Sequence, residues 1–143
     1  MKKNQKKNSS ELYAVIGLGR FGMALARELA AKGKSLLVID YDREKINEVL
    51  EFTDNAFVIN SLTIDALEET GIGEADVAVV CIGEKIDISI LATLNLMKLG
   101  VKRVISKAMS EEQGEVLKLL GAEVVYPEHD MALRLVSKLV SPH

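Results

Sequence analysis

Short apolar segments alternate with helical stretches along almost the whole chain. The apolar segments are rich in β-branched residues and mostly lack alternating polar positions, which is typical of strands buried on both faces of a parallel sheet. The predicted strands cover residues 12–16, 35–39, 55–59, 76–82, 103–107 and 122–126. The predicted helices cover residues 20–33, 42–52, 63–71, 84–100, 110–121 and 128–140.

Six successive strand–helix units predict the fold class. Because right-handed crossovers join parallel neighbours, such a chain forms an α/β, Rossmann-like, doubly wound sheet. We expect a six-stranded, mainly parallel sheet with helices on both faces. Asp42, Thr63 and Ser110 stand at N-cap positions, and four helices end at a glycine that tolerates the left-handed conformation. Those glycines are Gly33, Gly71, Gly100 and Gly121.

Composition and charge are those of an ordinary globular domain. The 143 residues are 48% hydrophobic and 27% charged, which predicts one domain with its own core. We expect residues 1–11 to form a disordered basic tail and residues 12–143 to form the domain. The net charge of −3 offers no bulk attraction to nucleic acid or to an anionic membrane. The longest uncharged stretches have ten residues, too few to cross a bilayer.

A glycine-rich turn marks the candidate binding site. The sequence Gly17-Leu-Gly-Arg-Phe-Gly22 follows the first predicted strand and opens the first predicted helix. In that context the GxGxxG spacing is typical of dinucleotide binding, because glycines let the backbone approach a diphosphate at a helix N-terminus. Alternatively, these glycines serve packing alone.

Asp40 ends the second predicted strand, 23 residues after Gly17. A carboxylate there can accept hydrogen bonds from both hydroxyls of an adenosine ribose. The same charge would repel a 2′-phosphate, so the sequence disfavours NADP. Alternatively, Asp40 only caps the next helix.

Arg20 places a cation inside the glycine-rich turn. The amides that open the first helix already attract an anion, and a guanidinium can reach a diphosphate or a terminal phosphate. A domain that senses the number of phosphates would benefit from this cation, whereas a dehydrogenase handles its diphosphate mainly with backbone amides. Alternatively, Arg20 lies over the helix surface.

Residues that catalysis would need are scarce. His143 is the last residue, His129 lies at the start of the final helix, and Cys81 lies in an apolar strand as a small core residue. No Ser–His–acid order, CxxC spacing or HExxH spacing occurs, so we identify no catalytic residue and no metal site. The sequence therefore predicts nucleotide binding without chemistry.

Five segments together resemble a known family. They are AVIGLGRFGMALARELAAKG, VIDYDREKI, DVAVVCIGE, VISKA and GAEVVYPEHDMA. They resemble the RCK N-terminal domain, also called the KTN or TrkA-N domain, of TrkA- and KtrA-type potassium uptake regulators. The resemblance covers residues 12 to 140, and its most specific parts are the arginine of GLGRFG and the PE-x-DM turn.

The resemblance implies a function and partners. Such domains are Rossmann folds that bind ATP, ADP or NAD(H), form homodimers that assemble into rings, and sit against a membrane-embedded potassium transporter or channel subunit. It implies a cytoplasmic regulatory subunit, peripheral to the inner face of the cell membrane through its partner. It implies ATP or ADP as the ligand, with NAD(H) also compatible.

The resemblance also implies nucleotide contacts, in the loops that follow successive strands. They are Gly17, Gly19 and Gly22 in the phosphate loop, with Arg20 and Phe21 between them; Asp40, Asn60 and Ser61 for the ribose and adenine; Ile82, Gly83 and Glu84 over the nucleotide; Lys107 at the end of the fifth strand; and Glu128 near the subunit interface and the phosphate end.

The sequence departs from the family in two respects. Many members have Asp where Asn60 stands, so an amide replaces a charge on the adenine side. Full regulators usually carry a second, C-terminal effector domain, whereas this sequence stops at His143. Either that domain has been removed or it is a separate protein.

Two helical stretches, residues 86–100 and 128–140, carry apolar residues around most of their circumference. Because a helix on one sheet face needs only an apolar stripe, we expect each to pack on a neighbouring subunit as well. The alternative for each is deep burial within the domain.

Two other functions stay open from the residues alone. The chain could be the cofactor-binding domain of an NAD-dependent oxidoreductase whose catalytic half lies elsewhere. It could also be an interaction domain with a vestigial nucleotide pocket.

Overall fold

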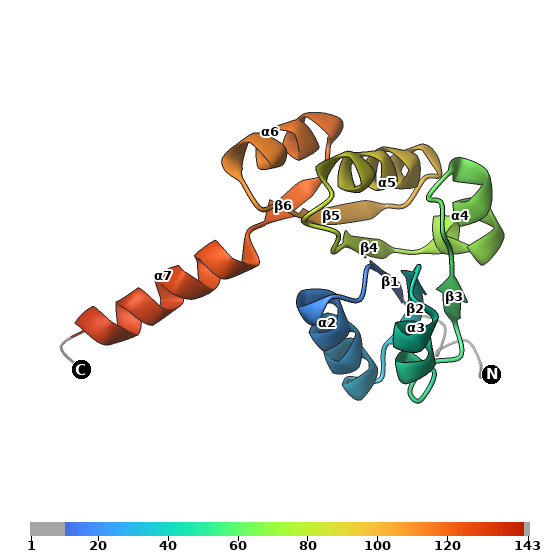
Figure 1. Cartoon of the computed structure of the whole chain (residues 1–143), viewed down its shortest axis with the longest axis horizontal. Coiled ribbons are helices and arrows are strands. Elements are labelled where there is room, and N and C mark those ends of the chain that lie inside the picture. The colour runs from blue at the N-terminus through green and yellow to red at the C-terminus, as the bar shows by residue number, and fades with distance from the viewer. Residues whose placement is uncertain (1–10, 142–143) are drawn as a thin grey trace.

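The computed structural model describes residues 11–141 and confirms the predicted fold class (Figure 1). Six strands form one sheet in the order β3-β2-β1-β4-β5-β6, and all neighbours are parallel. The strands are β1 (Leu12–Ile16), β2 (Ser35–Asp40), β3 (Ala56–Val58), β4 (Val77–Val80), β5 (Arg103–Lys107) and β6 (Glu123–Val125). Residues 1–10 of the predicted basic tail, and His143, lie outside the described residues.

The helices begin and end near their predicted boundaries. The predicted caps are confirmed, since the side chains of Asp42, Thr63 and Ser110 each accept a hydrogen bond from a first-turn amide. All four predicted terminal glycines have positive φ. The helices are α2 (Arg20–Ala31), α3 (Arg43–Val49), α4 (Ile64–Thr70), α5 (Ile86–Lys98), α6 (Glu111–Leu120) and α7 (Pro127–Val140), with a short 3-10 helix, η1 (Ile72–Glu74), that the sequence analysis did not predict.

Helices cover both faces of the sheet, as predicted. One core cluster joins alternate strand residues such as Ile16 and Ile39 to α4 and α5. The other joins the intervening residues, such as Val15 and Val38, to α2 and α3. Because successive strand residues point to opposite faces, both sets are buried, which explains why the strands lack polar alternation. Each such side chain contributes about 1.5–3 kcal/mol when fully buried.

The last helix, α7, projects away from the sheet (Figure 1). None of its residues is buried, and its apolar residues Met131, Leu135 and Leu139 are more than half exposed. The structure therefore contradicts burial of this helix within the domain. Among residues 11–141, no helix combines the length and the apolar character that crossing a bilayer requires.

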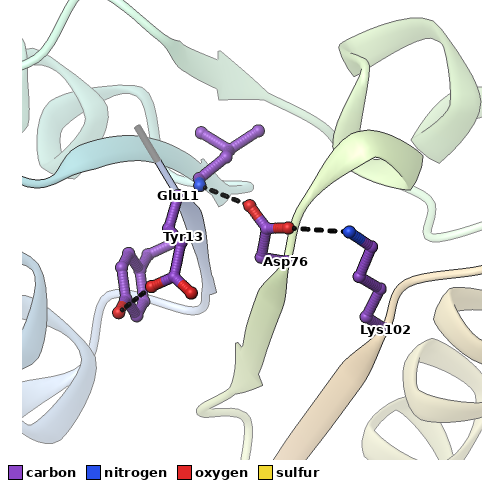
Figure 2. A network of polar contacts seen from close by, with 5 residues as sticks. Glu11, Tyr13, Asp76 and Lys102 are labelled. Carbon is purple, nitrogen blue, oxygen red and sulfur yellow. Dashed lines mark hydrogen bonds and ion pairs between the residues drawn. The ribbon is translucent and has the colours of Figure 1, made fainter. Parts of the chain in front are cut away.

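Polar side chains gather at the amino ends of the central strands (Figure 2). The carboxylate of Asp76, just before β4, accepts a hydrogen bond from the amide of Leu12 at 2.8 Å and pairs with Nζ of Lys102 at 3.2 Å. These two contacts lower the pKa of Asp76. The Tyr13 hydroxyl donates to Glu11 at 2.8 Å, and this hydrogen bond raises the pKa of Tyr13.

Replacing Asp76 by Asn should destabilise the fold in a pH-dependent way. The folded-state pKa lies below the ordinary 3.8, so the ionised carboxylate stabilises the fold above that pH. This contribution is lost as the pH falls from 3.8 through the lowered pKa. Calorimetric scans should show a lower Tm for Asp76→Asn at pH 7 and a smaller difference from wild type at about pH 2, where protonation of Asp76 removes its contribution. The same Tm difference at both pH values would contradict this assignment.

Candidate functional site

Two adjoining cavities lie at the carboxyl ends of the central strands, where the strand order reverses between β1 and β4. Their volumes are about 470 and 550 Å³, within the usual range of ligand pockets. Because five residues line both, the two cavities form a single crevice. Those shared residues are Gly17, Asp40, Tyr41, Ile82 and Lys85.

The first cavity, here called the apolar cavity, is lined mainly by aliphatic side chains together with Asn60 and Ser61. Ile88 and Leu91 of α5 belong to this wall, so part of the apolar surplus of that helix lines the crevice. The second cavity, here called the charged cavity, lies among the turn after β1, the loop after β4, the end of β5 and the start of α7.

The structure brings the predicted site residues together. All of them line the crevice except Gly22, and their contact with a ligand stays a prediction. Asn60 and Ser61 line the apolar cavity; Gly19, Arg20, Phe21, Gly83, Glu84, Lys107 and Glu128 line the charged cavity; Gly17, Asp40 and Ile82 line both.

The fold itself requires Gly17 and Gly22. Gly17 has a φ of +100°, which side chains rarely adopt, and its amide donates to the carbonyl oxygen of Ile39 at 2.9 Å. A Cβ on Gly22 would overlap the carbonyl oxygen of Gly17 and would lie 3.2 Å from the Cβ of Cys81. Packing of α2 against the turn and the end of β4 therefore explains these two glycines.

Gly19 has no such explanation within the chain. Its φ of −70° and ψ of −165° suit any residue, and a Cβ on it would meet no atom within 4 Å. It is the N-cap of α2, where Ser, Asp or Asn would cap the helix better. Of the ten glycines, it alone combines ordinary backbone angles with open space. That space adjoins the charged cavity, where a ligand could approach the backbone.

Asp40 ties the glycine-rich turn to the end of β2. Asp40 is 8% exposed. Its Oδ1 accepts a hydrogen bond from the backbone amide of Leu18 at 2.7 Å, and its Oδ2 accepts one from the backbone amide of Asp42 at 2.9 Å. Asp42, not Asp40, caps α3, because its own carboxylate accepts from the amide of Glu44. Each oxygen of Asp40 keeps a second lone pair, so the carboxylate can still accept hydrogen bonds from the crevice.

Cations outnumber acids in the charged cavity. Among residues 11–141, ion pairs form instead at the amino ends of the strands, where Lys102 pairs with Asp76 and Arg103 pairs with Glu123 at 2.6 Å. Free cations and the first-turn amides of α2 together favour an anion in the crevice. The cavity is lined by Arg20, Lys45, Lys85 and Lys107, and by the acids Asp40, Glu84 and Glu128.

Lys107 lies close to two other predicted site residues, Phe21 and Gly83. The Nζ of Lys107 lies 6.0 Å from the ring centroid of Phe21, within cation–π range. A Cβ on Gly83 would lie 2.7 Å from Cε of Lys107. The absence of a side chain at Gly83 therefore lets Lys107 lie over the loop after β4.

Several crevice residues were not predicted from the sequence, among them Tyr41, Lys45 and Lys85. The signal for Tyr41 was its place directly after Asp40, because loops at the carboxyl ends of parallel strands meet at the binding crevice. Ile88 and Leu91 gave no such signal, since aliphatic residues on a helix are typical of core positions.

The strand order, the glycine-rich turn and the crevice define the class of this protein as a Rossmann-like domain with the architecture of nucleotide-binding folds. The TrkA-N domain family matches residues 13–127. The chain belongs to the TrkA-N domain family, which confirms the resemblance carried by its sequence.

The curated relatives include potassium uptake proteins. The chain is 38% identical over 130 residues to the Ktr system potassium uptake protein C of Bacillus subtilis, an alignment that covers 90% of this chain and 59% of the relative. It is 36% identical over 135 residues to the Ktr system potassium uptake protein A of Vibrio alginolyticus, covering 94% and 61%. The chain thus spans about three fifths of the length of these relatives.

Solved structures share the fold. The TrkA-N domain of the Escherichia coli inner membrane protein ybaL has a TM-score of 0.81 at 20% identity, covering 92% of this chain and 98% of that chain. The GsuK channel bound to NAD has a TM-score of 0.70 at 16% identity, covering 82% and 22%. GsuK bound to ADP has a TM-score of 0.65 at 15% identity, covering 82% and 31%. At these identities the likeness concerns the fold alone.

Alanine substitutions should distinguish Gly22, which packing requires, from Gly19, which packing does not require. Gly22→Ala should lower the free energy of unfolding by about 2 kcal/mol or more, because its methyl group would overlap backbone. Gly19→Ala should change it by less than about 1 kcal/mol, because its methyl group would enter open space. Urea denaturation followed by circular dichroism measures both. Equal losses would show that packing fixes all the glycines of the turn.

Proposed function

We propose that this chain is the nucleotide-binding domain of a regulatory subunit that gates a potassium transporter or channel. The ligand is ATP or ADP, with NAD(H) also compatible. The subunit is cytoplasmic and is held at the inner face of the cell membrane by its pore-forming partner. Gly19 carries the proposal, because the chain's own packing leaves it unexplained beside a cavity lined by free cations. The potassium uptake relatives support the role, and the GsuK structures with NAD and ADP are examples of the same fold that holds such ligands.

The crevice suits an adenosine diphosphate group that lies across the carboxyl ends of the strands. The base enters the apolar cavity beside Asn60 and Ser61, and the remaining lone pairs of Asp40 accept the ribose hydroxyls. The diphosphate lies on the amides that open α2, next to Gly19. The Asp40 carboxylate would repel the 2′-phosphate of NADP.

The phosphate end of the ligand is where regulation arises. Arg20 reaches a terminal phosphate, and a ligand that lacks this phosphate leaves the guanidinium unpaired. Glu128 opens α7 and lines the same cavity, so ligand exchange there biases the position of that helix. A coupling of about 1–3 kcal/mol between ligand and assembly would be ordinary for such a switch.

In this proposal the domain binds without catalysis. Among the described residues that line the crevice there is no histidine. Its one thiol, Cys81, is buried, and burial raises the pKa of that thiol to about 12, so it is not a nucleophilic thiolate at neutral pH. The potassium uptake relatives also favour a regulatory role over an oxidoreductase.

The subunit is a homodimer that assembles into a ring, and α7 is its proposed contact. The large apolar residues of α7 are each more than half exposed, including Leu135 at 53% and Leu139 at 73%. A side chain of this kind contributes about 1.5–3 kcal/mol when fully buried, and exposed apolar patches mark interfaces. A second copy of the chain would cover this surface.

Nucleotide titration tests the proposed function. ADP, ATP and NAD should each raise the Tm of the wild-type chain, because a ligand at 100 times its Kd stabilises the folded state by about 2.7 kcal/mol. NADP should raise it less. Gly19→Ala should bind ADP at least about tenfold more weakly in calorimetry, because its methyl group would take the space beside the diphosphate. Failure of all four nucleotides to bind the wild-type chain would overturn the proposed function.

A second arm of the titration tests phosphate sensing. Arg20→Ala should weaken ATP binding by about tenfold more than ADP binding, because only ATP offers the extra charged acceptor. Arg27→Ala is the matched control, since Arg27 lies on the same helix and packs 5.3 Å from the ring centroid of Phe52. Equal losses for ATP and ADP in Arg20→Ala would count against the sensing role.

Charge on α7 should disrupt the assembly. The double substitution Leu135→Lys and Leu139→Lys should convert a dimer or larger species to monomer in analytical ultracentrifugation, while circular dichroism stays unchanged. Leu119→Lys is the control, because Leu119 of α6 is 87% exposed but lies outside α7. A monomeric wild-type chain, or an intact dimer in the double variant, would exclude α7 as the contact.

A further inference from the structure

Two residues outside the proposed nucleotide contacts span the crevice. Tyr41 follows β2 and Lys85 follows β4, so they come from loops on opposite sides of β1 and its glycine-rich turn. The Nζ of Lys85 lies 5.9 Å from the ring centroid of Tyr41, within cation–π range. Both residues line both cavities. The pair therefore crosses the crevice where the apolar and charged cavities meet.

Lys85 stands where helix chemistry disfavours it. It is the N-cap of α5, and its side chain makes no cap hydrogen bond, whereas Ser, Thr, Asn or Asp would cap the helix. The helix dipole also disfavours a cation at this end. Within the described part of the chain, its ammonium has no ion pair with a carboxylate. The lysine thus weakens the ligand-free fold while placing a cation beside the charged cavity.

We propose that Tyr41 and Lys85 form a clasp over the bound nucleotide. Lys85 leaves the ring and pairs with the diphosphate, and the ring of Tyr41 covers the ribose beside Asp40. Lys85 moves from the ring to the phosphate because an ammonium binds a phosphate oxygen more strongly than it binds an exposed aromatic face. Tyr41 is 67% exposed, so its ring has room to move. This inference rests on the proposed function and adds residues that hold the ligand from above the crevice.

Calorimetry with ADP and with adenosine tests the charged half of the clasp. Lys85→Asn should bind ADP about tenfold more weakly and bind adenosine within about twofold of wild type, because adenosine has no phosphate. The same variant should raise the Tm of the ligand-free chain by about 2 °C, because Asn can cap α5. Lys98→Asn is the matched control, since it removes an exposed lysine from the other end of the same helix.

The aromatic half is tested with the same two ligands. Tyr41→Ala should weaken ADP and adenosine by a similar factor of about five, because both carry the ribose that the ring covers. Tyr41→Phe keeps the ring and should restore binding of both ligands to within about twofold of wild type.

The outcomes separate the clasp from the proposed function. Absence of ADP binding to the wild-type chain would remove both. ADP binding to wild type with unchanged affinity in Lys85→Asn and Tyr41→Ala would leave the proposed function standing and overturn the clasp. Equal losses of ADP and adenosine in Lys85→Asn would also overturn it, because they would indicate a damaged crevice instead of a lost charge.

Discussion

The crevice depends on the close contact between α2 and the turn that precedes it. Because Gly22 has no side chain, the backbone of α2 lies directly against the carbonyl of Gly17, and the helix can begin at the end of β1. The buried carboxylate of Asp40 fixes the turn from the other side through the amide of Leu18. These constraints place the first residues of α2 in the lining of the charged cavity, and the amides of a helix N-terminus favour an anion there.

In the part of the chain that the structure describes, charged side chains form ion pairs at the amino ends of the strands but not in the charged cavity at the carboxyl ends. At the amino ends, Asp76 and Glu123 pair with Lys102 and Arg103, so the charges there stabilise the domain itself. At the carboxyl ends, the cations of the charged cavity have no carboxylate partner within residues 11–141. A cation without a partner contributes little to the fold, and this asymmetry is why the crevice suits the proposed anionic ligand. Under the proposed function, α7, whose first residues line the same cavity, would carry the effect of the ligand to a second subunit.

Local signals made the fold and much of the crevice predictable. Buried strands, N-caps and terminal glycines each require characteristic residue types at their own positions in the sequence. Loops that follow parallel strands meet at one edge of the sheet, so residues in these loops can be predicted to line a crevice. The path of α7 was not predictable in this way, because a projecting helix and a buried one can share the same apolar pattern. Contacts between loops that are distant in the sequence could not be predicted either. No residue near Tyr41 in the sequence indicates that Lys85 lies over its ring. The sequence left open whether Asp40 only caps the next helix. Its hydrogen bond to the amide of Leu18 depends on the three-dimensional path of the turn, so it could not be predicted from the sequence.

A crystal structure of this chain with ADP is the decisive test of nucleotide binding in the crevice. We expect density for the diphosphate on the amides that open α2, beside Gly19, with the ribose hydroxyls within hydrogen-bonding distance of Asp40 and the adenine in the apolar cavity. ADP bound elsewhere, or a crevice filled by the protein's own side chains in the presence of saturating ADP, would contradict it.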